Sequence, residues 1–162
     1  MLQSLTDQEL LQLIQRVFPR LEADRALAVL VDLPDDALFD HPEWATRRRL
    51  AEEWAGALAH GRGQAGLEDV ALIAYRNVRR NNADLPPTAH RVEPGRLPEH
   101  ADGLEGGELP FEEVFANFQI LLAPTELSAT APLKLAAREH GFRAATMGGF
   151  KASMVPALRL DY

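Results

Sequence analysis

The sequence predicts an α/β domain built on a mostly parallel sheet of about four to five strands, with helices on both faces. Short and almost uninterrupted apolar runs are typical of strands that are buried on both sides of a parallel sheet. Segments with helical apolar spacing alternate with these runs along the chain, as crossover connections require. We expect residues 1–162 to form a single domain, because this length can bury a sizeable core and shows no internal repeat.

The first expected helix follows Thr6. Thr6 and Glu9 match a capping box, in which two side chains satisfy the free N–H groups at a helix start. Pro19 is expected to end or loosen the last turn. Helical spacing then predicts one apolar face, made of Leu10, Leu13, Ile14, Val17, Phe18 and Leu21. The apolar run at 26–33 predicts the first buried strand.

A second helix is expected from residues 40–43 to Gly61, because proline suits the first turn of a helix and glycine its end. Arg47-Arg48-Arg49 lies within it, and Glu52 and Glu53 follow four residues after Arg48 and Arg49. This spacing predicts a solvent-exposed face of ion pairs, and anion binding by the three arginines is the alternative. One apolar side is expected, with Trp44, Ala51, Ala55 and Leu58.

The next buried strand is predicted at 69–75, and the amino-acid composition changes after it. Residues 77–110 are rich in proline and glycine, so we interpret them as a surface excursion with a short strand at 88–92. Long loops of this kind are often functional or mobile. Regular structure resumes with helices at 111–118 and 132–140 and strands at 119–123 and 143–147, and Gly141 ends the second of these helices.

Composition excludes several classes of function. The chain has no cysteine, which rules out a thiol nucleophile, a thiolate zinc site, an iron–sulfur cluster and a redox dithiol. Its net charge of −7 argues against a general nucleic-acid binder or a protein that binds anionic membranes. No apolar run is long enough to span a bilayer, and the amino-terminal residues do not resemble a signal peptide. We therefore expect a cytoplasmic protein.

Two motifs point away from common site chemistry. The run Gly61–Gly66 matches G-x-G-x-x-G, but a helix precedes it and a strand follows it, the reverse of the order that dinucleotide binding needs. We interpret it as a helix-to-strand turn. The five histidines show no zinc-binding spacing, and Glu99-His100-Asp102 offers metal-type atoms without a fourth ligand. His41 and His140 lie near expected helix ends, where capping is an ordinary role.

The segment from Ala123 to Phe150 is the most informative part of the chain. A buried strand ends there in a polar loop before a helix, and ligands of open α/β sheets gather beyond the carboxyl ends of strands. Helix capping by the loop hydroxyls is the alternative interpretation, and the glycine pair either lets backbone approach closely or permits a turn. The candidate ligand-binding residues are Thr125, Glu126, Ser128, Thr130, Gly148 and Gly149.

The last third of the chain carries a series of groups that occur together in one family. These groups are the strand Gln119–Ala123, the loop Thr125–Thr130, Ala136-Ala137-Arg138, Gly141-Phe142-Arg143, the strand end Ala145–Gly149 and Asp161-Tyr162. With them, the run from Val114 to Tyr162 resembles the amino-terminal domain of the aminopeptidase T-like (leucyl aminopeptidase-like) metalloenzymes. Two positions depart from that family's pattern: Ala129 stands where a histidine is common, and Gly148 where a proline is frequent.

The resemblance implies that this chain is a non-catalytic domain that shapes substrate access or supports dimerisation. In such enzymes the metal ligands belong to a second, carboxyl-terminal domain, so the resemblance implies no catalytic residue, metal ligand or cofactor in this chain. It implies a divalent metal in a missing domain, and as partners a second copy or that domain. The parent would be a metal-dependent aminopeptidase-like hydrolase, although ring-opening dioxygenases for dihydroxypyridines share the architecture.

Two alternatives stay open at the level of sequence. The chain could be a free-standing module that binds a small anionic ligand at the 125–132 loop, since the N–H groups at a helix start attract anions. It could also be a protein-interaction domain that uses the excursion at 77–110.

Overall fold

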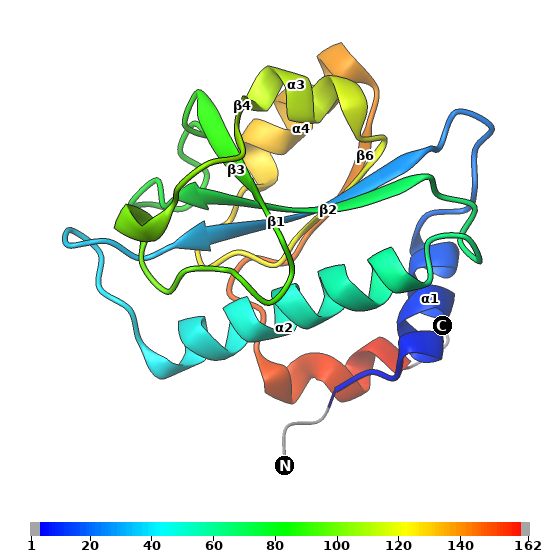
Figure 1. Ribbon diagram of the computed structural model, residues 1–162, viewed down its shortest axis with the longest axis horizontal. Coiled ribbons are helices and arrows are strands. Elements are labelled where there is room, and N and C mark those ends of the chain that lie inside the picture. The colour runs from blue at the N-terminus through cyan, green and yellow to red at the C-terminus, as the bar shows by residue number, and fades with distance from the viewer. Residues whose placement is uncertain (1–3, 160–162) are drawn as a thin grey trace.

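A six-stranded sheet with helices on both faces forms the computed structural model, which describes residues 4–159 (Figure 1). The strand order is β4-β3-β2-β1-β5-β6. Strands β2, β1, β5 and β6 are parallel, whereas β3 and β4 are antiparallel additions beside β2. The prediction of an α/β fold with a mostly parallel sheet is confirmed. The strands are β1 (Ala26–Leu33), β2 (Asp69–Arg76), β3 (Thr88–Val92), β4 (Glu108–Pro110), β5 (Ile120–Ala123) and β6 (Arg143–Thr146).

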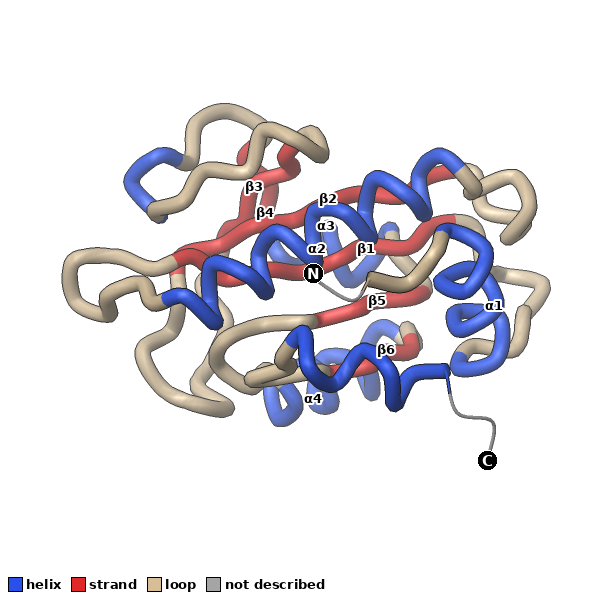
Figure 2. Tube along the Cα trace, turned by 90° about the horizontal axis from the view of Figure 1, so that it is seen from below, coloured by secondary structure: helices blue, strands red, loops and turns tan. Residues whose placement is uncertain are grey.

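The helices are divided between the two faces of the sheet, as Figure 2 shows from below. One face carries α1 (Asp7–Val17), α2 (Pro42–His60) and the 3₁₀ helix η2 (Ala152–Arg159). The other face carries α3 (Phe111–Asn117) and α4 (Thr130–His140). A further 3₁₀ turn, η1 (Ala101–Gly103), lies in the long connection between β3 and β4. Among the described residues, no helix is both long and apolar enough to cross a membrane.

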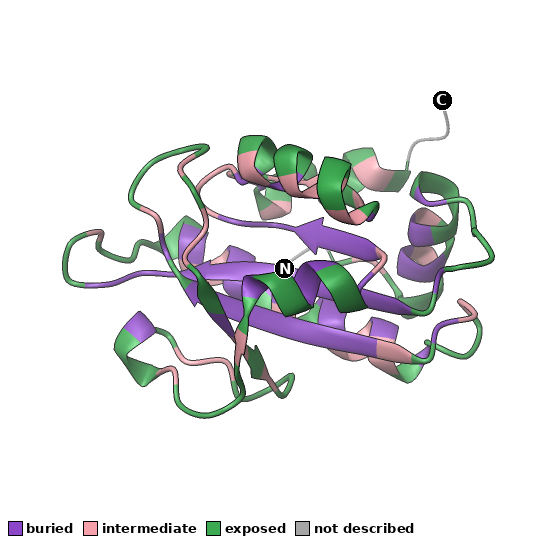
Figure 3. Ribbon diagram, turned by 90° about the horizontal axis from the view of Figure 1, so that it is seen from above, coloured by how far each residue is buried: buried purple, intermediate pink, exposed green. Residues whose placement is uncertain are grey.

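The central strand β1 explains why its sequence is an unbroken apolar run. Successive side chains of a strand point to opposite faces, and both faces of β1 are covered (Figure 3). Leu27 and Val29 pack into the core under α1 and α2, while Ala28 and Leu30 pack into the core under α3 and α4. A strand with one solvent-exposed face would show alternating polar residues instead.

Three elements were not expected from the sequence: the turn η1, the strand β4 and the helix η2. Strand β4 pairs with β3 and brings the sheet to six strands, above the expected four to five. It has three residues and ends in Pro110, which lacks an N–H group and is tolerated because β4 lies at the edge of the sheet. The helix η2 is a 3₁₀ element of eight residues that contains Pro156, and no element was expected from the sequence in this segment.

Helix α1 follows its predicted start but differs in its buried face. The capping box is present: Glu9 N donates to Thr6 Oγ1 at 3.1 Å, and Thr6 N donates to Glu9 Oε2 at 2.8 Å. Leu11 joins Leu10, Ile14 and Phe18 in the core. Val17 and Leu21 are 49% and 54% exposed, so their predicted place on the buried face is wrong. Helix α1 turns a face centred on Leu10, Leu11 and Ile14 toward the core, and the chain leaves that face beyond Val17.

Candidate functional site

The candidate site lies where the carboxyl ends of β1 and β5 meet. From β1 the chain crosses to β2 on one side, while β5 pairs with β1 on the other side. Loops that leave neighbouring parallel strands in opposite directions open a crevice between them, the usual place of a ligand in open α/β sheets. The loops that follow β1, β5 and β6 lie together at this end of the sheet (Figure 2).

Asp32 is the most buried charged side chain at this edge, with 1% of its surface exposed. Its two carboxylate oxygens accept hydrogen bonds from Glu126 N at 2.8 Å and Leu127 N at 3.0 Å. Burial raises the pKa of Asp32 to about 6, and the two N–H donors oppose that rise. Trp44 Nε1 donates to the backbone oxygen of Asp32 at 3.1 Å. Asp32 therefore anchors the loop after β5 to the central strand.

Glu126 links this loop to helix α2. Its Oε1 lies 2.8 Å from His41 Nε2, and its Oε2 accepts a hydrogen bond from Arg47. His41 is the N-cap of α2 and its Nδ1 accepts from Trp44 N, so the neutral ring carries its proton on Nε2 and donates it to Glu126. Arg47 Nε also donates to Phe150 O at 2.5 Å. One carboxylate thus connects the loops after β1, β5 and β6.

The prediction of a solvent-exposed arginine face on α2 is wrong for Arg47 and Arg48, whereas Arg49 is exposed. Arg47 and Arg48 are 3% and 4% exposed, and neither pairs with a glutamate on the same helix. Arg48 instead forms two hydrogen bonds with Asp40, at 2.8 and 2.6 Å. The four-residue spacing is compatible with local ion pairs, but the arginines pair instead with the loop carboxylates of Asp40 and Glu126. Burial of two guanidinium groups requires such partners.

A polar network surrounds the start of α4. Ser128 Oγ lies 3.0 Å from Thr130 Oγ1, which lies 2.8 Å from Thr146 Oγ1 at the end of β6. Thr130 N donates to Ser128 Oγ at 3.4 Å, and Ala131 N donates to Asn82 Oδ1 at 3.0 Å. The N–H groups that could hold an anion therefore have partners within the protein.

Asn81 and Asn82 also belong to this network, although no pattern in the sequence predicts their role. Asn81 Oδ1 accepts from Ser128 N at 2.9 Å, and Asn82 N donates to Ser128 O at 2.7 Å. These contacts carry the loop after β2 across to the loop after β5. Asn82 has a φ of 60°, a left-handed conformation that asparagine tolerates better than most residues. No local spacing in the sequence connects residues this far apart.

The glycine pair after β6 completes the edge. A Cβ atom on Gly148 would lie 2.8 Å from Ser128 Cα, so this backbone approach requires glycine. Gly149 N donates to Thr125 O at 2.8 Å, and Thr125 itself is fully buried. The structure thus brings the six candidate residues to one edge. Within it, Thr130 is exposed, whereas Glu126, Ser128 and Gly149 are half-buried.

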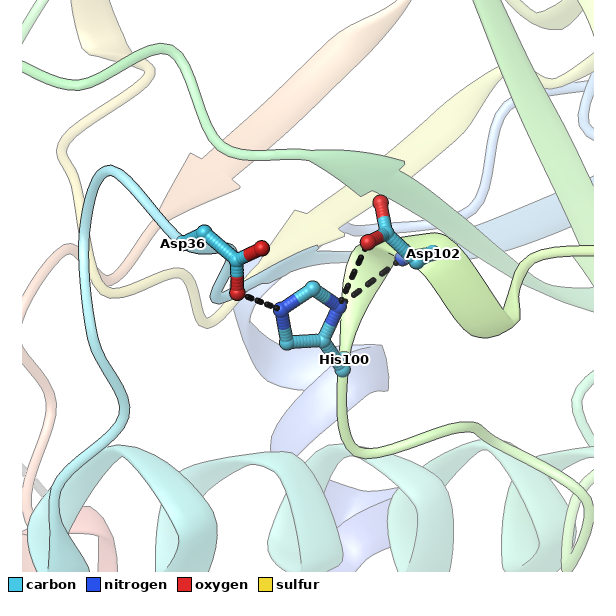
Figure 4. A group of neighbouring side chains, drawn as sticks. All are labelled: Asp36, His100 and Asp102. Carbon is cyan, nitrogen blue, oxygen red and sulfur yellow. Dashed lines mark hydrogen bonds and ion pairs between the residues drawn. The ribbon is translucent and has the colours of Figure 1, made fainter.

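A second polar cluster joins the loop after β1 to the excursion. His100 Nε2 lies 3.1 Å from Asp36 Oδ1, while Nδ1 accepts a hydrogen bond from Asp102 N at 3.0 Å. Figure 4 shows the ring between the two aspartates. Because both ring nitrogens have protein partners, neither offers a free lone pair to a metal ion. This arrangement indicates a structural role for His100, which links the two loops through its hydrogen bonds. Glu99 is not part of the cluster.

The remaining motifs lie where the sequence predicted. The glycine-rich run begins at Gly61, the C-cap of α2, and leads into β2, so it is a helix-to-strand turn. His140 is the last residue of α4, and Gly141 follows in the left-handed conformation with a φ of 80°.

Comparisons of this chain with protein-family models, with curated proteins and with solved structures find no match. The resemblance stated above therefore rests on the residues of the chain itself.

Proposed function

We propose that this chain is the non-catalytic amino-terminal α/β domain of an aminopeptidase T-like, metal-dependent peptidase. In this role the edge at the carboxyl ends of β1, β5 and β6 shapes the access of substrate to a metal centre on another domain, and the chain can dimerise. Peptide-bond hydrolysis takes place outside this chain.

One observation supports this proposal above the others: the residues that carry the resemblance also hold one another in place. Gly148 approaches Ser128, and Gly149 N donates to Thr125 O. Thr125 Oγ1 in turn donates to Leu127 O at 2.6 Å. The residues of the family resemblance named here therefore contact one another at one edge of the sheet. Asp161 and Tyr162, which also carry the resemblance, lie outside the described residues.

The contacts of this edge favour a rigid surface beside the access path over a flexible loop that closes on the substrate. Asp32 holds two N–H groups of the loop after β5, and Glu126 holds Arg47 and His41. Buried charges that are fully paired resist rearrangement, since breaking one pair leaves the other charge unpaired. A rigid surface of this kind sets the size and direction of an access path without touching the reacting atoms.

The alternative of an anionic ligand at the 125–132 loop has weaker support. It needs free N–H groups at the start of α4, and the N–H groups of Thr130 and Ala131 bind Ser128 and Asn82. An anion would have to displace these partners. The geometry therefore favours the first function.

Two measurements test the proposal. The purified 162-residue protein is expected to show no hydrolysis of aminoacyl p-nitroanilides above a metal-only control with Zn²⁺, Co²⁺ or Mn²⁺. Turnover that co-elutes with the protein in gel filtration would overturn the proposal. The gene is also expected to continue in frame after the codon for Tyr162, into a segment with glutamate, histidine, tyrosine and aspartate metal ligands. A stop codon at that point would contradict the two-domain arrangement.

A further inference from the structure

Within the excursion, the connection between β3 and β4 (residues 93–107) borders a cavity of about 590 Å³ at the ends of β2 and β3. This volume lies in the range of small-molecule sites. The excursion is fastened on two sides: Gly95 N and Leu97 N donate to Glu52 Oε2 on α2, and Ala101 N donates to Pro34 O after β1. The cavity lining consists of Arg76, Pro86, Thr88, His90, Ala101, Asp102 and Leu104.

Hydrogen-bond acceptors dominate the unpaired polar groups of this lining. His90 Nδ1 lies 2.9 Å from Gly106 O, and a carbonyl oxygen can only accept, so Nδ1 carries the ring proton. In the neutral ring Nε2 is therefore an acceptor. Thr88 and His90 are two residues apart on β3, so their side chains point to the same face. The Thr88 hydroxyl adds a further acceptor, and so does Asp102 Oδ2, because Arg76 donates to Oδ1 of that carboxylate.

The charge of the region is negative despite the presence of Arg76. Its guanidinium donates to Asp35 at 3.2 Å and to Asp102 at 2.6 Å. The hydrogen bonds that Arg76 donates to these two carboxylates raise the pKa of Arg76, and the two ion pairs balance its positive charge. Asp36 approaches Asp102 through His100, and Glu108 lies opposite His90 in the register of β3 and β4. Carboxylates therefore outnumber guanidinium groups around the cavity, which favours a positively charged ligand.

We propose that this cavity binds a small organic cation through a primary ammonium group. An ammonium group has three N–H donors and no acceptor, which matches His90 Nε2, the Thr88 hydroxyl and Asp102. The apolar stem of the ligand lies against Pro86, Ala101 and Leu104. This site is separate from the edge at β1, β5 and β6, and the inference does not rest on the function proposed above.

A metal ion shares the positive charge of this ligand but fits the lining less well. Within residues 4–159, the groups of three metal-type side chains that lie close together include His100 and His140, but His90 belongs to none of them. A single imidazole with one carboxylate is short of the four ligands that zinc takes. An organic cation needs only hydrogen-bond acceptors and an apolar wall.

Calorimetric titration with putrescine at fixed ionic strength and pH 7.5 tests this proposal, together with NMR of ¹⁵N-labelled histidine. Saturable binding with a shift of the His90 Nε2 resonance is expected, whereas the uncharged analogue 1,4-butanediol should not bind. His90→Phe and Thr88→Val should each weaken binding about tenfold, the effect of one hydrogen bond to a charged group. His60→Phe, which replaces an exposed histidine on α2, is the matched control and should bind as the wild type does.

Several results would overturn the proposal, provided that circular dichroism shows the variants to be folded. One is equal binding of 1,4-butanediol, and another is unchanged affinity in the His90→Phe variant. Displacement of putrescine by stoichiometric Zn²⁺ or Mg²⁺ would indicate a metal site in its place. A His90 shift with inorganic phosphate, and none with putrescine, would indicate an anion site.

Discussion

Asp32 shows how one side chain at the end of a strand can control a whole loop. Its carboxylate is deeply buried and still ionisable near neutral pH, because two backbone N–H groups offset part of the loss of solvation. The pKa is raised from an ordinary 3.8 to about 6, so the folded protein binds this proton more tightly than the unfolded chain does. The contribution of Asp32 to stability is therefore fully present below pH 3.8 and is lost as the pH rises through 6.

Asp32→Asn is expected to remove this pH dependence. In the wild type, the Asp32 contribution to the free energy of unfolding should increase by about 2 kcal/mol as the pH falls from 7 to 4. The variant should lack this increase and be less stable overall, because the amide replaces one acceptor by a donor facing an N–H group. Urea unfolding at several pH values measures the difference.

The matched control for this experiment is Asp84→Asn, which changes an exposed aspartate. It should retain the pH dependence of the wild type. The pKa values of Glu9, Asp35, Asp40, Asp69 and Asp102 are lowered, so their stabilising contributions decrease as the pH falls, in the direction opposite to that of Asp32. These groups are the same in the variant and in the wild type, so the difference between the two proteins reports on Asp32. Equal slopes in the Asp32 variant and the wild type between pH 4 and 7 would contradict the role assigned to Asp32.

At single residues, a sequence predicts some contacts and leaves others without a signal. Thr125, Glu126 and Ser128 could be selected because they follow a buried strand, and all three lie at the predicted edge. Arg47 was misjudged because its partner, Glu126, is 79 residues away in the sequence. Helical spacing describes only local neighbours, so a long-range ion pair has no signature in a single sequence.

At the scale of elements, the contact between the loops after β5 and β6 depends on a missing side chain. Gly148→Ala would place a Cβ atom 2.8 Å from Ser128 Cα and 3.0 Å from its Cβ, so backbone must move. We expect a loss of about 1–3 kcal/mol in the free energy of unfolding. Thermal unfolding followed by circular dichroism measures this loss.

Gly63→Ala is the matched control for that variant, because a Cβ atom there would meet nothing within 4 Å. It should leave the stability of the protein within about 0.5 kcal/mol of the wild type. If both variants unfold at the same temperature, the close approach between Gly148 and Ser128 does not stabilise the edge.

Elements with local signals were the predictable ones. The capping box fixed the start of α1, and Gly141 ends α4 in the conformation that a helix-terminal glycine adopts. Strand β4 escaped prediction because it has three residues, and its existence depends on pairing with β3. Such an edge strand is specified by tertiary contact, which periodicity does not record.

At the scale of the whole molecule, the excursion is held to both the sheet and α2. The sequence texture indicated a long surface connection, but composition alone could not show that Glu52 accepts hydrogen bonds from Gly95 N and Leu97 N. This single carboxylate joins segments more than forty residues apart. The proline- and glycine-rich connection is therefore held in place by hydrogen bonds to α2.

Glu52→Ala should release the connection between β3 and β4 from α2. Limited proteolysis is expected to cut within residues 93–107 several times faster than in the wild type, because exposed loops are cleaved when their backbone contacts open. Mass spectrometry of the first fragments locates the cut. Glu53→Ala, on the neighbouring exposed position, should leave the cleavage rate unchanged. Equal rates in the Glu52 variant and the wild type would contradict the anchoring role.

The position of β1 in the middle of the sheet has a consequence for the order of folding. One neighbour, β2, follows soon after helix α2, but the other, β5, is a distant segment: the hydrogen bond from Ala26 N to Gln119 Oε1 spans 93 residues. Pairing over such a separation is slow, since a large loop must close first. On a ribosome, β1 and β2 can associate while β5 is still unsynthesised, which leaves one apolar edge of β1 open to chaperones or to other nascent chains.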